Sequence, residues 1–217
     1  VGNEKESPVA RLVSLERAGG YTVDQRARQI LGLVPQFGGT VGAIRKSFLE
    51  QNGGFNGDTL AEDTDLTLLA VEQGYRVCYV HEAQSYEEAV STWRAYWHQR
   101  FRWAKGHMQC FFKHAGRVLK SKHLSARQKL DALMMLGTYF VPVVVGLGWI
   151  LGVTSFFFTK PFWLDYIYWT ALIFSTYSAV GNFAPFLEVG SALYLEGRHK
   201  RCSALPYLVV PFIVNVF

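Results

Sequence analysis

Cysteine is scarce in this sequence, and its spacing excludes two kinds of structure. The three cysteines, Cys78, Cys110 and Cys202, lie far apart, and no CxxC pair occurs. A disulfide framework or a cysteine-ligated zinc site needs paired or clustered cysteines. We therefore predict neither, and a reducing cytoplasmic environment fits.

Signals of processing and repetition are also missing. The sequence has no internal repeat and no low-complexity segment, and nothing at its start resembles a signal peptide. It begins at Val1 rather than methionine, and it stops at Phe217 inside an apolar run. We interpret it as a fragment that is open at both ends.

Charge is scarce in the last part of the chain. Residues 133–159 contain no charged residue, and residues 162–187 contain only Asp165. A third apolar run covers residues 205–217. Stretches of this length without charge can cross a bilayer with some tilt. We predict that residues 131–217 form transmembrane helices, two full spans and the start of a third.

Basic residues are unevenly distributed. The formal net charge is +5, and the basic excess is concentrated at residues 94–129. Aromatic residues interleave with these charges and an apolar stretch follows, which favours a lipid bilayer over nucleic acid as the partner. Because cytoplasmic loops are rich in Lys and Arg, we predict a multi-pass protein of the plasma or inner membrane. Residues 1–130 and the 196–201 loop would lie in the cytoplasm.

Local patterns before residue 90 predict an α/β layer. Thr59 and Glu62 have the spacing of a capping box, which predicts a helix at about 62–73. Residues 75–80 alternate and are rich in β-branched and aromatic side chains, which predicts a strand. A shorter helix is expected at 44–50, where two glycines end it. Helix and strand joined by short connections indicate an α/β fold.

A long amphipathic helix is predicted at about 92–114. Its apolar positions, many of them aromatic, recur mostly at helical spacing, and Arg94, His98, Arg102 and Lys105 fill other faces. Such a helix can lie along a membrane interface, or it can pack on a soluble core. The apolar stretches that follow favour the interface, so we expect residues 91–130 to be an interfacial helix and basic connector.

Carboxylates cluster where the 62–73 helix begins. Glu62, Asp63 and Asp65 would stabilise the helix dipole, which is a sufficient reason for their presence. A catalytic interpretation needs one of them held in a cleft beside a hydroxyl that it can deprotonate. The helix N-terminus would favour the ionised form that a general base requires.

The string at residues 99–103 has two interpretations as well. Arginine grips phosphate oxygens through paired donors, tryptophan offers a flat face to a sugar ring, and glutamine can donate and accept. A basic aromatic string on an interfacial helix is also a common membrane anchor. The string reads Gln99, Arg100, Phe101, Arg102 and Trp103.

The two strings together, followed by apolar spans, resemble glycosyltransferase family 2. In its membrane-bound processive members, the cellulose, hyaluronan, chitin and poly-N-acetylglucosamine synthases, a Thr-Glu-Asp triplet precedes Gln-(Gln/Arg)-x-Arg-Trp. Here Ala61 replaces the threonine, and every fixed position of the second motif matches. The resemblance implies an α/β fold of the GT-A type, of which residues 1–90 would be the C-terminal part. It implies an inverting β-glycosyltransferase that extends a polysaccharide from a UDP-sugar.

The resemblance also implies roles for individual residues. Asp63 would be the general base that deprotonates the acceptor hydroxyl, and Glu62 would be a neighbour that shapes the site. Gln99 and Arg102 would hold the diphosphate of the leaving nucleotide. Trp103 would support the terminal acceptor sugar.

Three further points follow from the resemblance. Arg100 would assist in binding or face lipid headgroups, and Gly39 belongs to a glycine-rich stretch that would reach the acceptor sugar. The family holds Mg²⁺ or Mn²⁺ with an Asp-x-Asp motif, which we expect upstream of Val1. Asp63-Thr64-Asp65 has those letters but follows a helix start rather than a strand end, so we assign no metal ligand here.

Two other functions remain open. A non-catalytic membrane module, such as a transporter segment or a scaffold, would use the carboxylates for the helix dipole and residues 99–103 for lipid. A single-transfer lipid glycosyltransferase would keep the chemistry without processivity, although the second motif argues against it. The sequence identifies neither the sugar nor any protein partner, and without the donor-binding half we expect residues 1–217 alone to be inactive.

Overall fold

The computed structural model describes residues 1–158 and 183–210. The chain divides into two compact units, Val1–Tyr139 and Phe140–Phe217. The predicted boundaries at residues 90 and 130 stay predictions.

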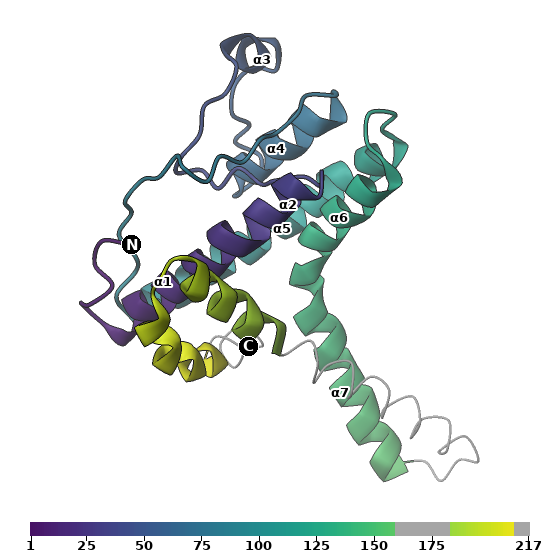
Figure 1. Ribbon diagram of the computed structural model, residues 1–217. Helices are drawn as coiled ribbons and strands as arrows, with labels where there is room; N and C mark the ends of the chain where they lie inside the picture. The colour runs from purple at the N-terminus through teal and green to yellow at the C-terminus, as the bar shows by residue number, and fades with distance from the viewer. Residues whose placement is uncertain (159–182, 211–217) are drawn as a thin grey trace. The chain divides into compact units, whose positions relative to one another are not determined.

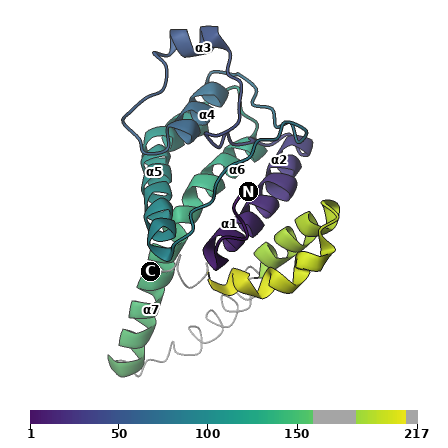
Figure 2. The ribbon, with the colours of Figure 1, turned by 90° about the vertical axis from the view of Figure 1, so that its left-hand side faces the viewer.

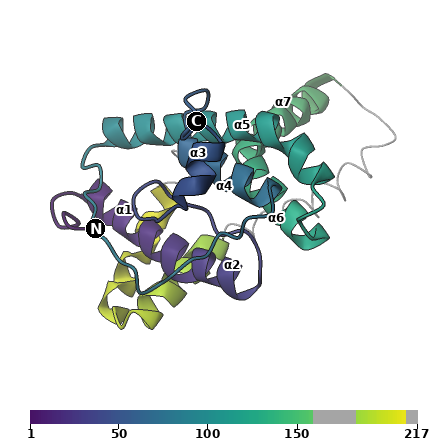
Figure 3. The same cartoon turned by 90° about the horizontal axis from the view of Figure 1, so that it is seen from above.

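The first unit is built of helices. The described ones are α1 (Pro8–Ala18), the π-helix η1 (Gly19–Gln25), α2 (Arg26–Ile30), α3 (Lys46–Gln51), α4 (Glu62–Glu72), α5 (Trp93–Lys120) and α6 (Ala126–Gly137). A short 3-10 helix, η2 (Thr138–Phe140), follows α6. Figures 1 and 3 show α1, η1 and α2 as a nearly continuous rod. The helices expected at 62–73 and 92–114 are confirmed, and the second of them is longer than predicted.

Helix α5 is the element on which α4 and α6 pack (Figure 2). Its buried face contributes Cys110 and Val118 to a core that also contains Leu68 and Val71 of α4 and Leu136 of α6. Burial of these side chains removes apolar surface from water and is the main stabilising contribution to the unit. The packing fixes the start of α4 against the middle of α5.

A close contact sets the crossing of α4 and α5. A Cβ atom added at Gly106 would lie 2.8 Å from the Cβ atom of Ala61 and 2.9 Å from the carbonyl carbon of Leu60. Only glycine allows the backbones to approach this closely. The predicted capping box is wrong, because α4 begins at Glu62 and Ala61 is its N-cap, without a side-chain cap. Thr59 is therefore not the N-cap of α4, and its side chain does not cap the helix.

The predicted strand at residues 75–80 is also wrong. The segment follows α4 as an irregular chain, and no β-ladder forms among the residues that the structure describes. The backbone N–H of Tyr79 donates to Gln29 Oε1 at 2.9 Å. A strand needs a neighbouring backbone for its N–H and C=O groups, and here a side chain takes one of those places.

The soluble-core interpretation of the long amphipathic helix describes one of its faces, and the membrane-interface interpretation stays a prediction. One face of α5 is buried against α4 and α6, as in a soluble core. Another face leaves large apolar side chains exposed along the length of the helix, and these are Trp93, Trp97, Phe101, Phe112 and Leu119. We call these five residues the α5 apolar stripe.

The second unit begins with α7 (Val141–Phe158), and it also contains an apolar helix at Phe183–Leu195 and the 3-10 helix η3 (His199–Leu208). Among the described residues, one helical stretch, Ala126–Gly148, is long and apolar enough to cross a membrane, judged on length and composition. It takes in α6, η2 and the start of α7. Most of the predicted second span and part of the third lie outside the described residues. The multi-pass arrangement therefore stays a prediction.

Candidate active site

Asp63 lies in the first turn of α4, half-buried, with a glycine loop against it. Its Oδ1 accepts a hydrogen bond of 2.6 Å from the backbone N–H of Thr64. Gly39 has a φ of +76°, and a Cβ atom added there would lie 2.9 Å from Asp63 Oδ2. The structure thus brings together two predicted site residues, and glycine is the residue that fits this approach.

The loop that carries Gly39 is attached to α4 through two side chains. The backbone N–H of Phe37 donates to Thr67 Oγ1 at 3.1 Å, and the Thr67 hydroxyl donates to the Asp63 carbonyl at 2.9 Å. Gln36 Nε2 donates to Thr64 Oγ1 at 2.6 Å. These contacts hold the loop in register with the first turn of α4.

A buried polar cluster connects the same turn of α4 to α5. His107 Nε2 lies 3.0 Å from Gln36 Nε2 and 3.3 Å from Thr64 Oγ1. On the other side of the ring, Nδ1 lies 2.7 Å from the carbonyl oxygen of Trp103. We call Gln36, Thr64 and His107 the His107 cluster. It joins the surroundings of Asp63 to the backbone of Trp103.

Burial controls the charge of His107. The ring is 8% exposed and stacks on Tyr139 with a centroid distance of 4.4 Å. Burial lowers the pKa of His107, although the Trp103 carbonyl and the charge of Asp63 oppose this. The ring is therefore neutral near pH 7.

Two guanidinium groups lie over the ring of Trp103. The Cζ atoms of Arg100 and Arg17 lie over its ring, 4.6 Å and 5.2 Å from the centroid. Arg17 also lies over Tyr21 and pairs with Glu87 at 2.7 Å. These stacked cations are attracted to the negative face of the ring system.

Arg100 is tied to α1. Its Nη2 forms an ion pair with Glu16, whose other oxygen accepts 2.9 Å from the hydroxyl of Tyr96. Burial raises the pKa of Glu16, and the charge of Arg100 opposes it. In this structure Arg100 therefore holds α5 to α1, a use that the sequence interpretation did not foresee.

Gln99, Arg102 and Glu62 lie in different environments. In the part of the chain that the structure describes, Gln99 Oε1 is buried without a hydrogen-bond partner. Arg102 and Glu62 are exposed. Arg102 shares a helix column with Gly106 and Gln109, since residues three and four apart are neighbours, and Gln109 Oε1 accepts 3.0 Å from the backbone N–H of Leu60. Arg102 thus lies on the side of α5 that faces the start of α4.

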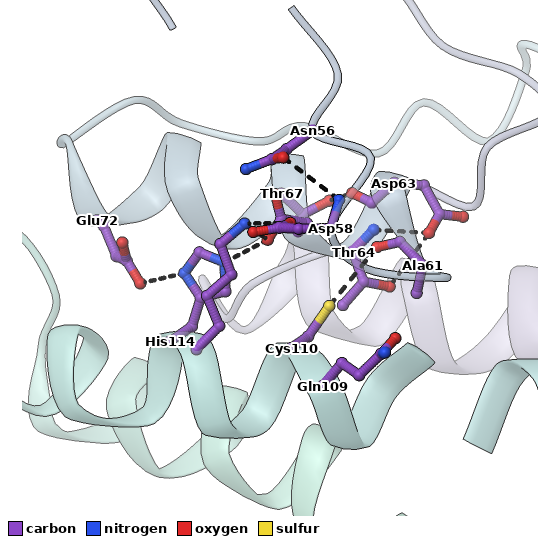
Figure 4. A network of polar contacts seen from close by, with 12 residues as sticks. Asn56, Asp58, Ala61, Asp63, Thr64, Thr67, Glu72, Gln109, Cys110 and His114 are labelled. Atoms are coloured by element: carbon purple, nitrogen blue, oxygen red, sulfur yellow. Dashed lines mark hydrogen bonds and ion pairs between the residues drawn. The ribbon is translucent and has the colours of Figure 1, made fainter. Parts of the chain in front are cut away.

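Asp65 belongs to a separate charged cluster. Its Oδ1 receives Lys113 Nζ at 2.7 Å and His114 Nε2 at 2.8 Å, while His114 Nδ1 lies 2.6 Å from Glu72 Oε1. Figure 4 shows His114 reaching from α5 toward Glu72, with Asp63 at the opposite end of the network. We call Asp65, Glu72, Lys113 and His114 the His114 cluster.

The charges of this cluster stabilise one another. Burial acts to raise the pKa of Asp65, but hydrogen bonds from His114 and Lys113 outweigh it, and the pKa is lowered. Burial acts to lower the pKa of His114, but its hydrogen bonds to Asp65 and Glu72 outweigh it, and the pKa is raised. Both ring nitrogens of His114 lie at hydrogen-bond distance from carboxylate oxygens, which accept, so the contacts fit an imidazolium that bridges two carboxylates.

The same contacts show that Asp63-Thr64-Asp65 does not fit a metal ion. Asp65 Oδ1 pairs with two cationic side chains, and their positive charge disfavours a metal ion at this carboxylate. Within residues 1–158 and 183–210, no group of three or more His, Cys, Asp or Glu side chains could hold a metal ion. We assign no metal ligand in these residues.

Sequence comparison places the chain in a family. The model of the family described as Glycosyl transferase family group 2 matches residues 4–181. The chain belongs to glycosyl transferase family group 2. Membership of this family suggests a GT-A fold and argues against a transporter segment or a scaffold without catalytic ancestry.

Curated relatives carry several glycosyltransferase names. "Probable glycosyltransferase YdaM" of Bacillus subtilis is 30% identical over 139 residues, which cover 64% of this chain and 33% of the relative. "Probable glucomannan 4-beta-mannosyltransferase 4" of Oryza sativa is 34% identical over 125 residues, covering 58% and 22%. "Beta-monoglucosyldiacylglycerol synthase" of Trichormus variabilis is 35% identical over 120 residues, covering 54% and 25%.

The matched region is a third or less of each of these relatives. No solved structure matches the chain.

Sequence reasoning missed Gln36, His107 and Arg17. The signal for His107 was its position four residues after Trp103, which places both on one helix face; Gln36 and Arg17 have no comparable signal.

Proposed function

We propose that this chain carries the acceptor side and the general base of an inverting β-glycosyltransferase. The donor would be a UDP-sugar, and the acceptor would be the end of a growing polysaccharide. The observation that carries the proposal is Asp63, half-buried at the start of α4 with Gly39 held against its Oδ2. Oδ1 of this carboxylate accepts from a backbone N–H, and Oδ2 lies beside the Gly39 backbone.

Asp63 would act on the acceptor hydroxyl. As that oxygen attacks the anomeric carbon, its proton passes to the Asp63 carboxylate, and the bond from the anomeric carbon to the UDP phosphate oxygen breaks. The backbone N–H of Thr64 donates to Oδ1 and leaves Oδ2 on the side of Gly39. General-base catalysis contributes roughly 10²–10⁴ in rate. Glu62, which is exposed, would shape the surroundings of the base.

The donor would be held by the residues 99–103 string on α5. Gln99 and Arg102 would bind the diphosphate, because the Arg102 side chain is exposed on the face toward α4. Arg100 would keep α5 in place through Glu16 rather than bind phosphate directly. We expect Mg²⁺ or Mn²⁺ to be bound by an Asp-x-Asp pair upstream of Val1.

Trp103 would carry the terminal acceptor sugar. Its backbone is connected to the turn that bears Asp63 through His107. A sugar ring would stack on the indole in place of one guanidinium, and Arg17 is the more distant of the two. Arg17 would retain its pairing with Glu87 when it moves aside.

The membrane would lie against the α5 apolar stripe, whose exposed aromatic side chains suit an interface. The catalytic part would then work at the cytoplasmic face of a plasma or inner membrane, where the polymer leaves through the spans. The helix at Ala126–Gly148 supports this arrangement by its length and composition. Nucleic acid has no place in this proposal.

A second candidate is the transfer of a single sugar to a lipid acceptor. It is favoured by the cyanobacterial relative named beta-monoglucosyldiacylglycerol synthase, whereas the rice relative is named a glucomannan mannosyltransferase. The resemblance of Gln99–Trp103 to processive synthases favours the polymer.

The experiment is Asp63→Asn in the full-length protein, assayed in membranes with radiolabelled nucleotide sugars. We expect kcat to fall by roughly 10²–10⁴ while nucleotide binding is retained. Asp58→Asn is the matched control, because Asp58 is an exposed carboxylate near the same turn. Substantial activity in Asp63→Asn would refute the base. The length and solubility of the product distinguish a polysaccharide from a glycolipid.

A further inference from the structure

The hydrogen atoms of the His107 cluster can be assigned from its contacts. The Trp103 carbonyl can only accept, so His107 Nδ1 at 2.7 Å must carry a hydrogen. In the neutral ring Nε2 is then an acceptor. Gln36 Nε2 has two hydrogens, which point to Thr64 Oγ1 at 2.6 Å and to His107 Nε2 at 3.0 Å.

His107 Nε2 also lies 3.3 Å from Thr64 Oγ1, but it already accepts from Gln36, so the Thr64 hydroxyl hydrogen is left for the base. Having accepted from Gln36, Thr64 Oγ1 can donate to Asp63 Oδ1, which lies 3.3 Å away. Each donor then has one acceptor in a chain that runs from the Trp103 carbonyl to the Asp63 carboxylate. The chain connects the proposed sugar platform to the proposed base.

Protonation of His107 would disrupt this arrangement. A hydrogen on Nε2 would face the amide nitrogen of Gln36, which is also a donor. Among the described residues, the titratable or charged groups around the ring are Asp63 from α4 and Tyr139 from η2, with Arg100 beyond Tyr139. Asp63 reaches the ring through Thr64 and does not offset a direct contact between two donors.

We propose that His107 is a positioning residue that, with Gln36 and Thr64, aligns the base Asp63 with Trp103, and that it acts only as the neutral imidazole protonated on Nδ1. The inference rests on the proposed role of Asp63. A misplacement of about 1 Å in a catalytic group can cost on the order of 10² in rate. An imidazole shared by both ends of the site is therefore a point of control.

The test compares two substitutions of His107 in the full-length enzyme. His107→Asn places an amide donor near the Trp103 carbonyl but has no acceptor for Gln36. His107→Gln places an amide oxygen where Nε2 was, so it can accept from Gln36 without ever becoming charged. We expect kcat to fall about 10–100-fold in His107→Asn, with KM for the nucleotide sugar unchanged, and to recover largely in His107→Gln.

The pH profile gives the decisive readout. In the wild type we expect kcat to fall as pH drops below about 6.5, the ordinary histidine pKa, toward the lowered pKa of His107. In His107→Gln this part of the acid limb should disappear. A wild-type kcat in His107→Asn, or an unchanged acid limb in His107→Gln, would overturn the inference.

Two further variants separate positioning from misfolding. Gln36→Leu should lower kcat, and the double variant with His107→Asn should be no slower than the worse single variant, because both break one network. Additive losses would contradict a shared network. The exposed His98 on the same helix provides the control, and His98→Gln should leave kcat and the pH profile unchanged.

The outcomes also separate this inference from the proposed function. If Asp63→Asn is active, the base assignment fails whatever the His107 variants do. If Asp63→Asn is inactive while both His107 variants behave as the wild type, only the positioning network fails. Retained nucleotide binding in each variant shows that the site is folded.

Discussion

His107 and His114 both lie on the buried face of one helix but differ in charge, since His107 is neutral and His114 is cationic. They lie about two turns apart on the buried face of α5, 8% and 0% exposed, and both face α4. His107 contacts an amide, a hydroxyl and a carbonyl, whereas His114 contacts two carboxylates. Burial favours the neutral ring in both, and only the carboxylates overcome it. The pair shows that partners rather than depth decide the charge of a buried histidine.

The two clusters also hold α4 against α5 by different kinds of contact. The His114 cluster holds α4 by charge at Asp65 in its first turn and at Glu72 at its end, while the His107 cluster contacts Thr64, the neighbour of Asp63. The neutral contacts are thus the ones next to the proposed base.

Removal of the charged histidine should have the largest effect on stability. His114→Leu leaves the buried carboxylate of Asp65 and the half-buried carboxylate of Glu72 short of a partner, and breaking a buried pair costs about 3–5 kcal/mol. Lys113 still pairs with Asp65 and keeps the loss toward the lower end. Denaturant unfolding in detergent measures it. A loss equal to that of His98→Leu would show that the His114 cluster contributes nothing.

Disruption of the close contact between Gly106 and Ala61 should have the next largest effect on stability. Gly106→Ala introduces a Cβ atom 2.8 Å from the Ala61 Cβ atom, so α4 must shift from α5. Overpacking of this kind costs about 1–3 kcal/mol and moves the turn that carries Asp63, so we expect lower activity as well. Gly116→Ala is the matched control, because a Cβ atom there meets nothing within 4 Å. Equal effects of the two substitutions would contradict the close crossing.

Removal of the neutral histidine should destabilise the protein least. His107→Leu costs about 1 kcal/mol, the net value of a neutral hydrogen bond, because Gln36 keeps its bond to Thr64. Activity should fall more than stability suggests. If His107→Leu and His114→Leu lose equal stability, the two clusters do not differ in charge as described.

The pH dependence of stability should have opposite signs at the two sites. The pKa of His114 is raised, so its stabilisation is complete below about 6.5 and is lost as pH rises through its folded pKa. The pKa of His107 is lowered, so its neutral form is compatible with folding above about 6.5, and stability is lost as pH falls toward its folded pKa. Thermal unfolding of the wild type, His114→Gln and His107→Gln between pH 5 and 8 measures how stability changes with pH. The difference between the wild type and each variant is the contribution of that histidine. Contributions of the same sign at the two sites would contradict the comparison.

Helices were predictable here because they depend on local periodicity. The helices at Glu62–Glu72 and Trp93–Lys120 follow from apolar spacing and from nearby stop signals. The strand predicted at 75–80 from alternation was wrong, because a strand depends on a partner that local sequence does not specify. The capping box failed because Ala61, packed on Gly106, sets where α4 begins.

The proposed site was predictable in its motifs but not in its connections. Asp63 and Gly39 were both expected, and the structure brings them together. Arg100 had two expected roles, and its ion pair with Glu16 is a third. No pattern around Gln36 indicated that its amide would reach His107, which lies 71 residues away in the chain.

The sequence by itself determined the helical periodicity, the segregation of charge from apolar stretches, and the two motifs that resemble glycosyltransferase family 2. Only the tertiary structure decided the protonation of His107 and His114, the direction of Arg100 and the closeness of Gly39 to Asp63. The physical reason is that these properties depend on desolvation and on partners distant in the chain. A charge state follows from the atoms that surround a group, and folding alone selects those atoms.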